Sequence, residues 1–218
     1  IDILGEAKGI LPSTEWKRRA YKKAEQQRWY SGETISLGIG QGYNSYTMLQ
    51  LAQATATLVN DGTQMRPHLV REVIDPVTND RNIIAKAPVA QMSFKPEHMA
   101  AIRQAMVDVN LYGTSAASFV GATYTSGGKT GTAQVYTVKQ NEKYNASRVG
   151  EYLRDHALFI AYAPAEQPKV ALAMVVENAG FGAQNAAPIA RRVFDYVVNG
   201  QYPSAEDIAA VQRGQATR

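Results

Sequence analysis

The sequence contains no cysteine and only three histidines among its 218 residues. The absence of cysteine excludes disulfide bonds, catalysis by a thiolate and zinc sites built on cysteine. His68, His98 and His156 fall in different predicted elements without the spacing of metal ligands, so we predict no metal site. No apolar run approaches the ~20 residues that a membrane-spanning helix needs, and the first residues lack a signal-peptide pattern.

Charge of either sign is modest, with 23 basic against 19 acidic residues and a formal net charge of +4. The basic residues cluster clearly only at positions 17–23, which we interpret as a solvated helix face rather than an anion site. Nucleic-acid binding would require basic residues interleaved with stacking aromatic residues along one surface. We therefore predict no nucleic-acid partner.

The first half of the chain predicts helices and one peripheral hairpin. Residues 15–30 form a polar, aromatic stretch that ends in the turn signal Ser31-Gly32-Glu33. Apolar positions in residues 48–59 recur at helical spacing and predict a buried helix, which Asn60-Asp61-Gly62 ends in a left-handed cap. Residues 68–74 and 81–85 flank a turn and predict the hairpin.

The second half predicts a mixture of helices and strands, which is typical of the α+β class. Pro96 begins a helix over residues 98–110, whose apolar face is Met99, Ile102, Met106 and Val109. Residues 156–162 and 170–176 are apolar strands, and Pro188 begins a helix over residues 189–198. The sequence begins at Ile1 without an initiator methionine, so we expect further sequence to precede it.

Residues 127–133 read GGKTGTA, and this strand carries the clearest chemical signal. Lys129 offers a fixed cation for a substrate carboxylate, and Thr130 adds a hydroxyl donor beside it. Gly131 has no side chain, so a substrate backbone can lie against the strand and pair with its edge. These residue types predict recognition of an extended peptide that ends in a carboxylate.

The order of this strand after a helix and before two strands and a helix resembles the C-terminal part of the transpeptidase domain of class B penicillin-binding proteins. A second motif, GQG at 40–42 followed by LQLA at 49–52, carries the same resemblance. The sequence around Tyr46-Thr47-Met48 is similar to that of penicillin-binding protein 2, the cell-elongation type. The resemblance implies a penicillin-recognising transpeptidase fold, an antiparallel sheet flanked by helices. It assigns residues 1–202 to the domain and 203–218 to a polar, disordered tail.

The family resemblance also implies an activity, that of a serine-type peptidoglycan D,D-transpeptidase that β-lactams inhibit and that uses no cofactor. In this family Lys129 and Thr130 would hold the terminal carboxylate and Gly131 would allow docking. The backbone N–H of Thr132 would form half of the oxyanion hole.

The family's nucleophile lies in a Ser-x-x-Lys motif at the start of a helix, and a second serine motif precedes the Lys-Thr-Gly strand. Ser126 and Lys129 match the first spacing but overlap the strand motif, so we interpret Ser126 as a coincidence. We find no acceptable second motif. We therefore expect the nucleophile to lie upstream of Ile1 and the 218-residue chain alone to be inactive.

The partners implied by the resemblance are peptidoglycan stem peptides, β-lactams, the upstream remainder of the domain, a membrane glycosyltransferase and an elongation scaffold. The implied location is the periplasmic face of the bacterial inner membrane, with the anchoring segment absent from these residues. Residues 139–154 form a long polar loop directly after the substrate strand, and we predict that it is mobile and shapes the mouth of the site.

Three alternative functions remain. Gly128-Lys129-Thr130 matches the end of a nucleotide-binding loop, but Thr123 replaces the first glycine and a strand follows where a helix is required. A non-catalytic module of the same fold that binds a peptide or a partner would explain the missing nucleophile. A serine β-lactamase would need a deacylating base in a segment that we cannot match here.

Overall fold

The computed structural model describes residues 1–135, 145 and 149–212. It divides into two compact units, one formed by Ile3–Gln50 and the other by Ile1–Asp2 with Leu51–Arg218.

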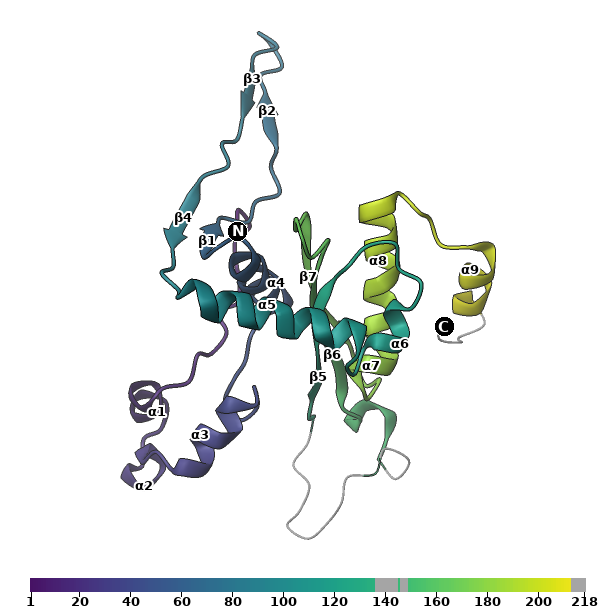
Figure 1. Ribbon diagram of the computed structural model, residues 1–218. Coiled ribbons are helices and arrows are strands. Elements are labelled where there is room, and N and C mark those ends of the chain that lie inside the picture. The colour runs from purple at the N-terminus through teal and green to yellow at the C-terminus, as the bar shows by residue number, and fades with distance from the viewer. Residues whose placement is uncertain (136–144, 146–148, 213–218) are drawn as a thin grey trace. The chain divides into compact units, whose positions relative to one another are not determined.

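The larger unit is built on a three-stranded antiparallel sheet in the order β5-β6-β7 (Figure 1). The strands are β5 (Gly127–Ala133), β6 (His156–Ala163) and β7 (Val170–Val176). Residues 156–162 and 170–176 were the predicted strands, so these predictions are confirmed. Lys129 pairs with Ile160 and Gly131 pairs with Leu158 in the register of β5 with β6.

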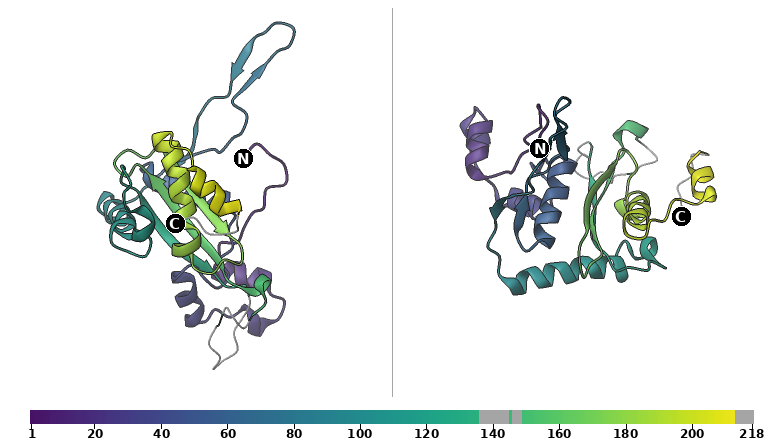
Figure 2. Two further views of the ribbon diagram at one scale, coloured as in Figure 1. Left: turned by 90° about the vertical axis from the view of Figure 1, so that its right-hand side faces the viewer. Right: turned by 90° about the horizontal axis from the view of Figure 1, so that it is seen from above.

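The core lies on one face of this sheet. Alternate residues of β6 point to the same face of the sheet, and Ala157, Phe159 and Ala161 are completely buried there. They form one apolar cluster with Phe119 and with residues of α8, among which Phe194 is also completely buried. Figure 2 shows α8 against the sheet in both views. The sheet and α8 therefore form the two layers that fix the position of β5.

Helices before and after the sheet complete this unit: α5 (Pro96–Leu111), α6 (Ala116–Phe119), α7 (Gly182–Asn185), α8 (Ala187–Asn199) and α9 (Ala205–Gln212). The predicted helices 98–110 and 189–198 are confirmed as parts of α5 and α8. The predicted core face of α5 is partly wrong, because Ile102 is half-exposed whereas Met106 and Asn110 are buried. A polar residue at the C-terminal end of α5 therefore takes a core position.

The hairpin predicted between residues 68 and 85 is confirmed, although its ladder is short. It consists of β2 (Glu72–Ile74) and β3 (Arg81–Ile83), which pair antiparallel. A second small sheet joins β1 (Thr63–Met65) to β4 (Pro88–Gln91). Helix α4 (Met48–Val59) precedes them and is followed by Asp61 and Gly62, which both have positive φ as predicted. Only Thr55 and Thr57 of α4 are buried, so the helix is less covered than predicted.

The smaller unit contains three short helices, α1 (Thr14–Ala20), α2 (Ala24–Gln27) and α3 (Ser31–Gly38). The predicted turn at Ser31-Gly32-Glu33 is wrong, because these residues begin α3. Glu33 accepts a hydrogen bond from the backbone N–H of Tyr30 at 2.8 Å, which supplies the first turn of the helix with a partner.

The interpretation of the basic cluster as a solvated face is wrong for Lys17. Its side chain is buried and forms an ion pair with Glu33, while its Nζ lies 5.1–6.0 Å from the ring centroids of Trp29, Tyr30 and Tyr43. Nζ also donates to the carbonyl oxygen of Arg28 at 2.7 Å. A cation surrounded by aromatic faces and a carboxylate joins α1 to α3.

Acid should loosen this unit. The hydrogen bond from Lys17 is the main cause that lowers the pKa of Glu33, followed by that from the backbone of Tyr30. A carboxyl whose pKa is lowered by folding stabilises the fold when ionised, and this contribution disappears as the pH falls below about 4.5 and through the lowered value. Both tryptophans, Trp16 and Trp29, lie in this unit, so their fluorescence should change in that range.

The matched variant for this measurement is Glu33→Gln, which should already show the loosened spectrum at neutral pH and a flatter acid titration. Identical titration curves for the two proteins would show that the ion pair with Lys17 does not hold the unit together.

The C-terminal segment contains α9, although residues 203–218 were expected to be a disordered tail. Ser204 and Asp207 cap the start of this helix, and Asp207 accepts from Arg192 of α8 at 2.7 Å. Residues 213–218 lie outside the described residues. Across the ranges described, no helix has both the length and the apolar character needed to cross a bilayer.

Candidate functional site

Strand β5 carries the residues predicted to bind substrate. Within the described residues it pairs only with β6, so its other edge carries no strand. Gly127 and Gly128 are buried at its start, Lys129 is exposed, and the residues from Thr130 to Ala133 are half-buried. The accessible part of the strand therefore begins at the predicted lysine.

The two glycines before Lys129 allow close packing of the strand. A Cβ atom at Gly127 would lie 2.5 Å from the ring of Tyr162, and one at Gly128 would lie 2.5 Å from Cζ of Phe159. Real Cβ contacts are essentially never this short, so aromatic rings of β6 occupy the space that side chains would need. Sequence reasoning assigned no role to this pair, because the contact depends on the register with β6.

Lys129 and Thr130 lie side by side with polar contacts of their own. Nζ of Lys129 donates to the carbonyl oxygen of Thr130 at 2.7 Å. The hydroxyl of Thr130 lies 3.0 Å from the hydroxyl of Thr114, in the turn between α5 and α6. A cation and two linked hydroxyls thus gather near the accessible part of β5, a combination that suits a carboxylate. Sequence reasoning missed Thr114, for which residue spacing offers no signal.

Gly131 and Thr132 continue the strand. A Cβ atom at Gly131 would lie 3.1 Å from Cβ of Leu158, which is tight, so the glycine also serves packing against β6. Gly182 at the start of α7 lies close to the same place, since its own Cβ would come 2.7 Å from the carbonyl oxygen of Gly131. The close approach of α7 thus supports β5 at Gly131.

Ser126 does not have the setting of a nucleophile at the start of a helix. It precedes β5 directly, is 3% exposed, and its Oγ accepts a hydrogen bond from Nδ2 of Asn110 at 2.9 Å. Lys129 is on a strand, so the two residues are not one helical turn apart. This environment favours the interpretation of the Ser-x-x-Lys match as a coincidence.

Two of the three histidines have polar partners of their own. Nδ1 of His68 lies 2.8 Å from the carbonyl oxygen of Val70, and Nδ1 of His156 accepts from the backbone N–H of Asn178 at 2.9 Å. Among residues 1–135, 145 and 149–212, no three histidine, aspartate or glutamate side chains come together as metal ligands would. The loop predicted to shape the mouth of the site covers residues 139–154, of which 139–144 and 146–148 lie outside the described residues.

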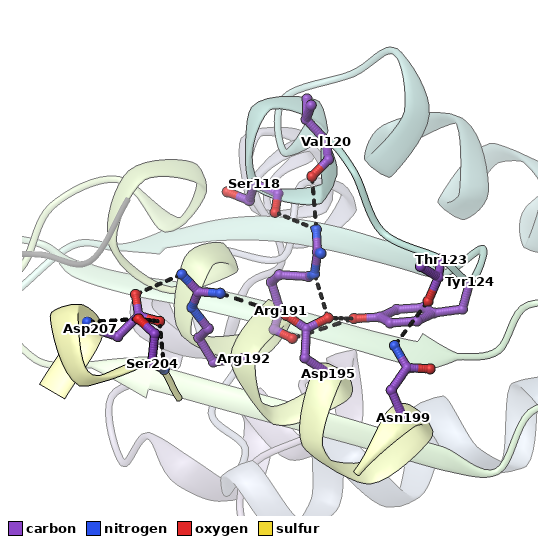
Figure 3. A network of polar contacts seen from close by, with 10 residues as sticks. All are labelled: Ser118, Val120, Thr123, Tyr124, Arg191, Arg192, Asp195, Asn199, Ser204 and Asp207. Carbon is purple, nitrogen blue, oxygen red and sulfur yellow. Dashed lines mark hydrogen bonds and ion pairs between the residues drawn. The ribbon is translucent and has the colours of Figure 1, made fainter. Parts of the chain in front are cut away.

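A network of polar contacts supports the connection between α5 and β5 from the side of α8 (Figure 3). Nη1 of Arg191 donates to the carbonyl oxygens of Ser118 and Val120 at 3.4 and 3.1 Å. The hydroxyl of Tyr124 donates to Oδ1 of Asp195 at 2.8 Å, and Nε of Arg191 donates to the same oxygen at 2.7 Å. Burial is the largest cause that raises the pKa of Tyr124, followed by the bond to Asp195, so this phenol stays a neutral donor.

Comparison with known proteins identifies the family of this chain. Residues 2–195 match the family described as "Penicillin binding protein transpeptidase domain". The peptidoglycan D,D-transpeptidase MrdA of Haemophilus influenzae is 42% identical over 207 residues, which are 94% of this chain and 31% of the relative. The chain therefore spans about a third of the length of this curated relative.

Solved structures of similar proteins indicate the same family. The structure of PBP2 from Pseudomonas aeruginosa superimposes with a TM-score of 0.71 and 35% identity, over 94% of this chain and 42% of the other. PBP2 of Helicobacter pylori, solved in complex with MreC, superimposes with a TM-score of 0.67 and 26% identity, over 91% of this chain and 33% of the other. The penicillin-recognising transpeptidase fold, of mixed α+β class, is therefore confirmed.

Proposed function

Because the chain belongs to the penicillin-binding protein transpeptidase family, we propose that the protein carrying it is a peptidoglycan D,D-transpeptidase of the cell-elongation type. The observation that supports this proposal most directly is the accessible part of β5. There an exposed lysine and a threonine lie on a strand with one edge unpaired within the described residues. Such an edge suits an extended peptide, which can pair with it as an additional strand.

Lys129 and Thr130 bind the terminal carboxylate of the stem peptide in this proposal. The cation attracts the carboxylate, and the hydroxyl of Thr130 donates a hydrogen bond to it. Gly131 lets the peptide backbone approach the strand without a side chain in the way. β-Lactams carry a carboxylate too, so they would use the same two residues.

The backbone N–H of Thr132 supplies half of the oxyanion hole. In an antiparallel strand the backbone groups of alternate residues point toward the same side. The carbonyl oxygen of Thr130 accepts from the side chain of Lys129, which suits a group on the unpaired edge. By alternation the N–H of Thr132 points to that edge as well, where the reacting carbonyl would lie.

The nucleophile is a serine outside these 218 residues. Its Oγ forms an ester with the carbonyl carbon of the penultimate D-alanine, while the bond to the terminal D-alanine breaks and that residue leaves with the proton. The amine of a neighbouring stem peptide then takes the acyl group, and the serine regains its proton. A β-lactam opens its ring on the same serine and stays bound. The 218-residue chain alone is inactive in this scheme.

The protein works on the periplasmic face of the inner membrane in this proposal, held there by a segment outside these residues. Its partners are a membrane glycosyltransferase and an elongation scaffold. Support for the scaffold comes from the similar PBP2 of Helicobacter pylori, whose structure was solved as a complex with MreC. Support for the elongation type comes from the identity with the MrdA relatives.

A fluorescent penicillin tests this function. We expect a version of the protein extended upstream to the length of its relatives to become covalently labelled, and the 218-residue chain to stay unlabelled. A denaturing gel and the intact mass report the label, and Ser126→Ala in the extended version should still become labelled, because Ser126 is not the nucleophile in this proposal. Labelling of the short chain would make Ser126 the first suspect as nucleophile. If neither version is labelled, a non-catalytic module of the same fold becomes the better function.

A further inference from the structure

The last turn of α5 places a buried amide next to the start of β5. Asn110 is 3% exposed and uses both ends of its side chain. Nδ2 donates to Oγ of Ser126 at 2.9 Å, and Oδ1 accepts from Oγ of Ser115 at 2.7 Å. A buried amide that loses such partners is strongly disfavoured, so these bonds hold three separate segments together.

One bond reaches Ser126, the residue before β5, and the other reaches Ser115, in the turn that contacts β5. Ser126 precedes Gly127, and a Cβ atom at Gly128 would come 3.0 Å from Oδ1 of Asn110. The amide therefore lies directly beside the backbone one residue before Lys129. Ser115 follows Thr114, whose hydroxyl contacts that of Thr130. Asn110 thus connects the residue that leads into the strand with the turn that contacts it.

A pocket lies beside this junction. Asn110 and Ser126 border a cavity of about 630 Å³, whose wall also includes Phe119, Tyr124 and Pro164. The side chains of Asn110 and Ser126 are both 3% exposed, so water cannot replace a hydrogen bond that either of them loses. Arg191 and Asp195 hold the middle of the connection on α8, at residues 118–124 (Figure 3). Asn110 bonds to both ends of the connection, at Ser115 and at Ser126.

On the basis of the function proposed above, we propose that Asn110 is a positioning residue for the substrate strand. Its two hydrogen bonds set where β5 begins and where Thr114 meets Thr130, and so they align Lys129 and Thr130 with a substrate carboxylate. Asn110 does not touch substrate itself. It acts through Ser126 and Ser115, and its loss leaves the lysine and threonine present but displaced.

The test uses Asn110→Leu in the extended version, because leucine has a similar volume and cannot make either bond. We expect acylation by a penicillin to slow on the order of 10- to 100-fold, since small displacements of binding groups have effects of this size. The ratio of acylation rates for the penicillin and for its methyl ester, which lacks the free carboxylate, should fall too. Backbone amide exchange of the segment Gly127–Ala133 should become faster.

Two further variants separate positioning from stability. Ser126→Ala removes only the bond to the start of the strand, so it should show a smaller change of the same kind. Thr57→Val removes another buried side-chain hydrogen bond, that to Gln53 in α4, and should leave acylation, the ester ratio and exchange of β5 unchanged. If Asn110→Leu does not fold, Ser126→Ala carries the test.

The outcomes decide the two proposals independently. Failure of the unsubstituted extended protein to be acylated would overturn the proposed function, and amide exchange of β5 would then decide the role of Asn110 alone. The role of Asn110 is overturned if the ester ratio and the exchange rates in Asn110→Leu and Ser126→Ala match those in Thr57→Val. A loss of stability without these two changes would also overturn it.

Discussion

In the protein extended upstream to the length of its relatives, replacing Lys129 with alanine should slow β-lactam acylation about 100-fold or more. Lys129 is exposed on the accessible part of β5, beside Thr130. In the proposed function it supplies the cation for the substrate carboxylate. Its removal takes away a charge-assisted hydrogen bond that alanine cannot replace. The second-order rate constant of acylation, measured from the time course of labelling with a fluorescent penicillin, gives the size of the effect.

The control for this substitution is Lys169→Ala. Lys169 is another exposed lysine, at the turn between β6 and β7, and its backbone N–H, which donates to Ala163, remains in the variant. This change removes the same net charge from the protein but should leave the acylation rate as it was. Equal rates for Lys129→Ala and the unsubstituted protein would exclude Lys129 from the site.

Gly182→Ala should lower the free energy of unfolding by about 3 kcal/mol, at the upper end of the range for overpacked sites. The new Cβ atom would lie 2.1 Å from the carbonyl oxygen of Leu158 and 2.7 Å from that of Gly131. Both contacts are with backbone atoms, which cannot rotate away as a flexible side chain would. Either α7 or the pair of strands β5 and β6 must move. Thermal and urea unfolding measure the loss, and acylation should slow as Gly131 is displaced.

Gly32→Ala is the matched control for that substitution. Gly32 lies in the first turn of α3, and a Cβ atom there would meet nothing within 4 Å. An alanine in a helix restricts the unfolded chain, so this variant should be unchanged or more stable by about 0.4–1 kcal/mol. If Gly182→Ala were equally harmless, α7 would not pack against β5 as closely as the structure has it.

The residues of the strand GGKTGTA could be identified from the sequence, and so could the order of elements around it. That identification depended on local patterns, namely a motif, a helix with apolar residues at regular spacing and two apolar strands. The neighbours that align the strand could not be identified in this way. Asn110, Ser115 and Ser126 are common polar residues, and only the meeting of a helix end, a turn and a strand start makes them partners.

The sequence predictions that were wrong failed for the same reason, because contacts between distant segments decide these features. Ser31-Gly32-Glu33 reads locally as a turn, but Glu33 caps α3 and pairs with Lys17 from α1, so a distant contact favours the helix. Lys17 belongs to a run of basic residues that would be solvated on an isolated helix. Its burial depends on three aromatic rings from residues 29–43. Helix α9 likewise gains a contact with Arg192 that its own polar composition does not predict.

Local sequence patterns were enough to predict the strand with its lysine, the positions of α4, α5 and α8, and the family, because each depends on residues close together in the chain. Contacts in the folded chain were needed to find which glycines have no room for a side chain, which lysine is buried and which amide bonds to the residue before β5. These properties depend on the distance between atoms from segments far apart in the sequence. Such distances follow from the register of β5 with β6 and the approach of α5 and α7, which no local pattern encodes.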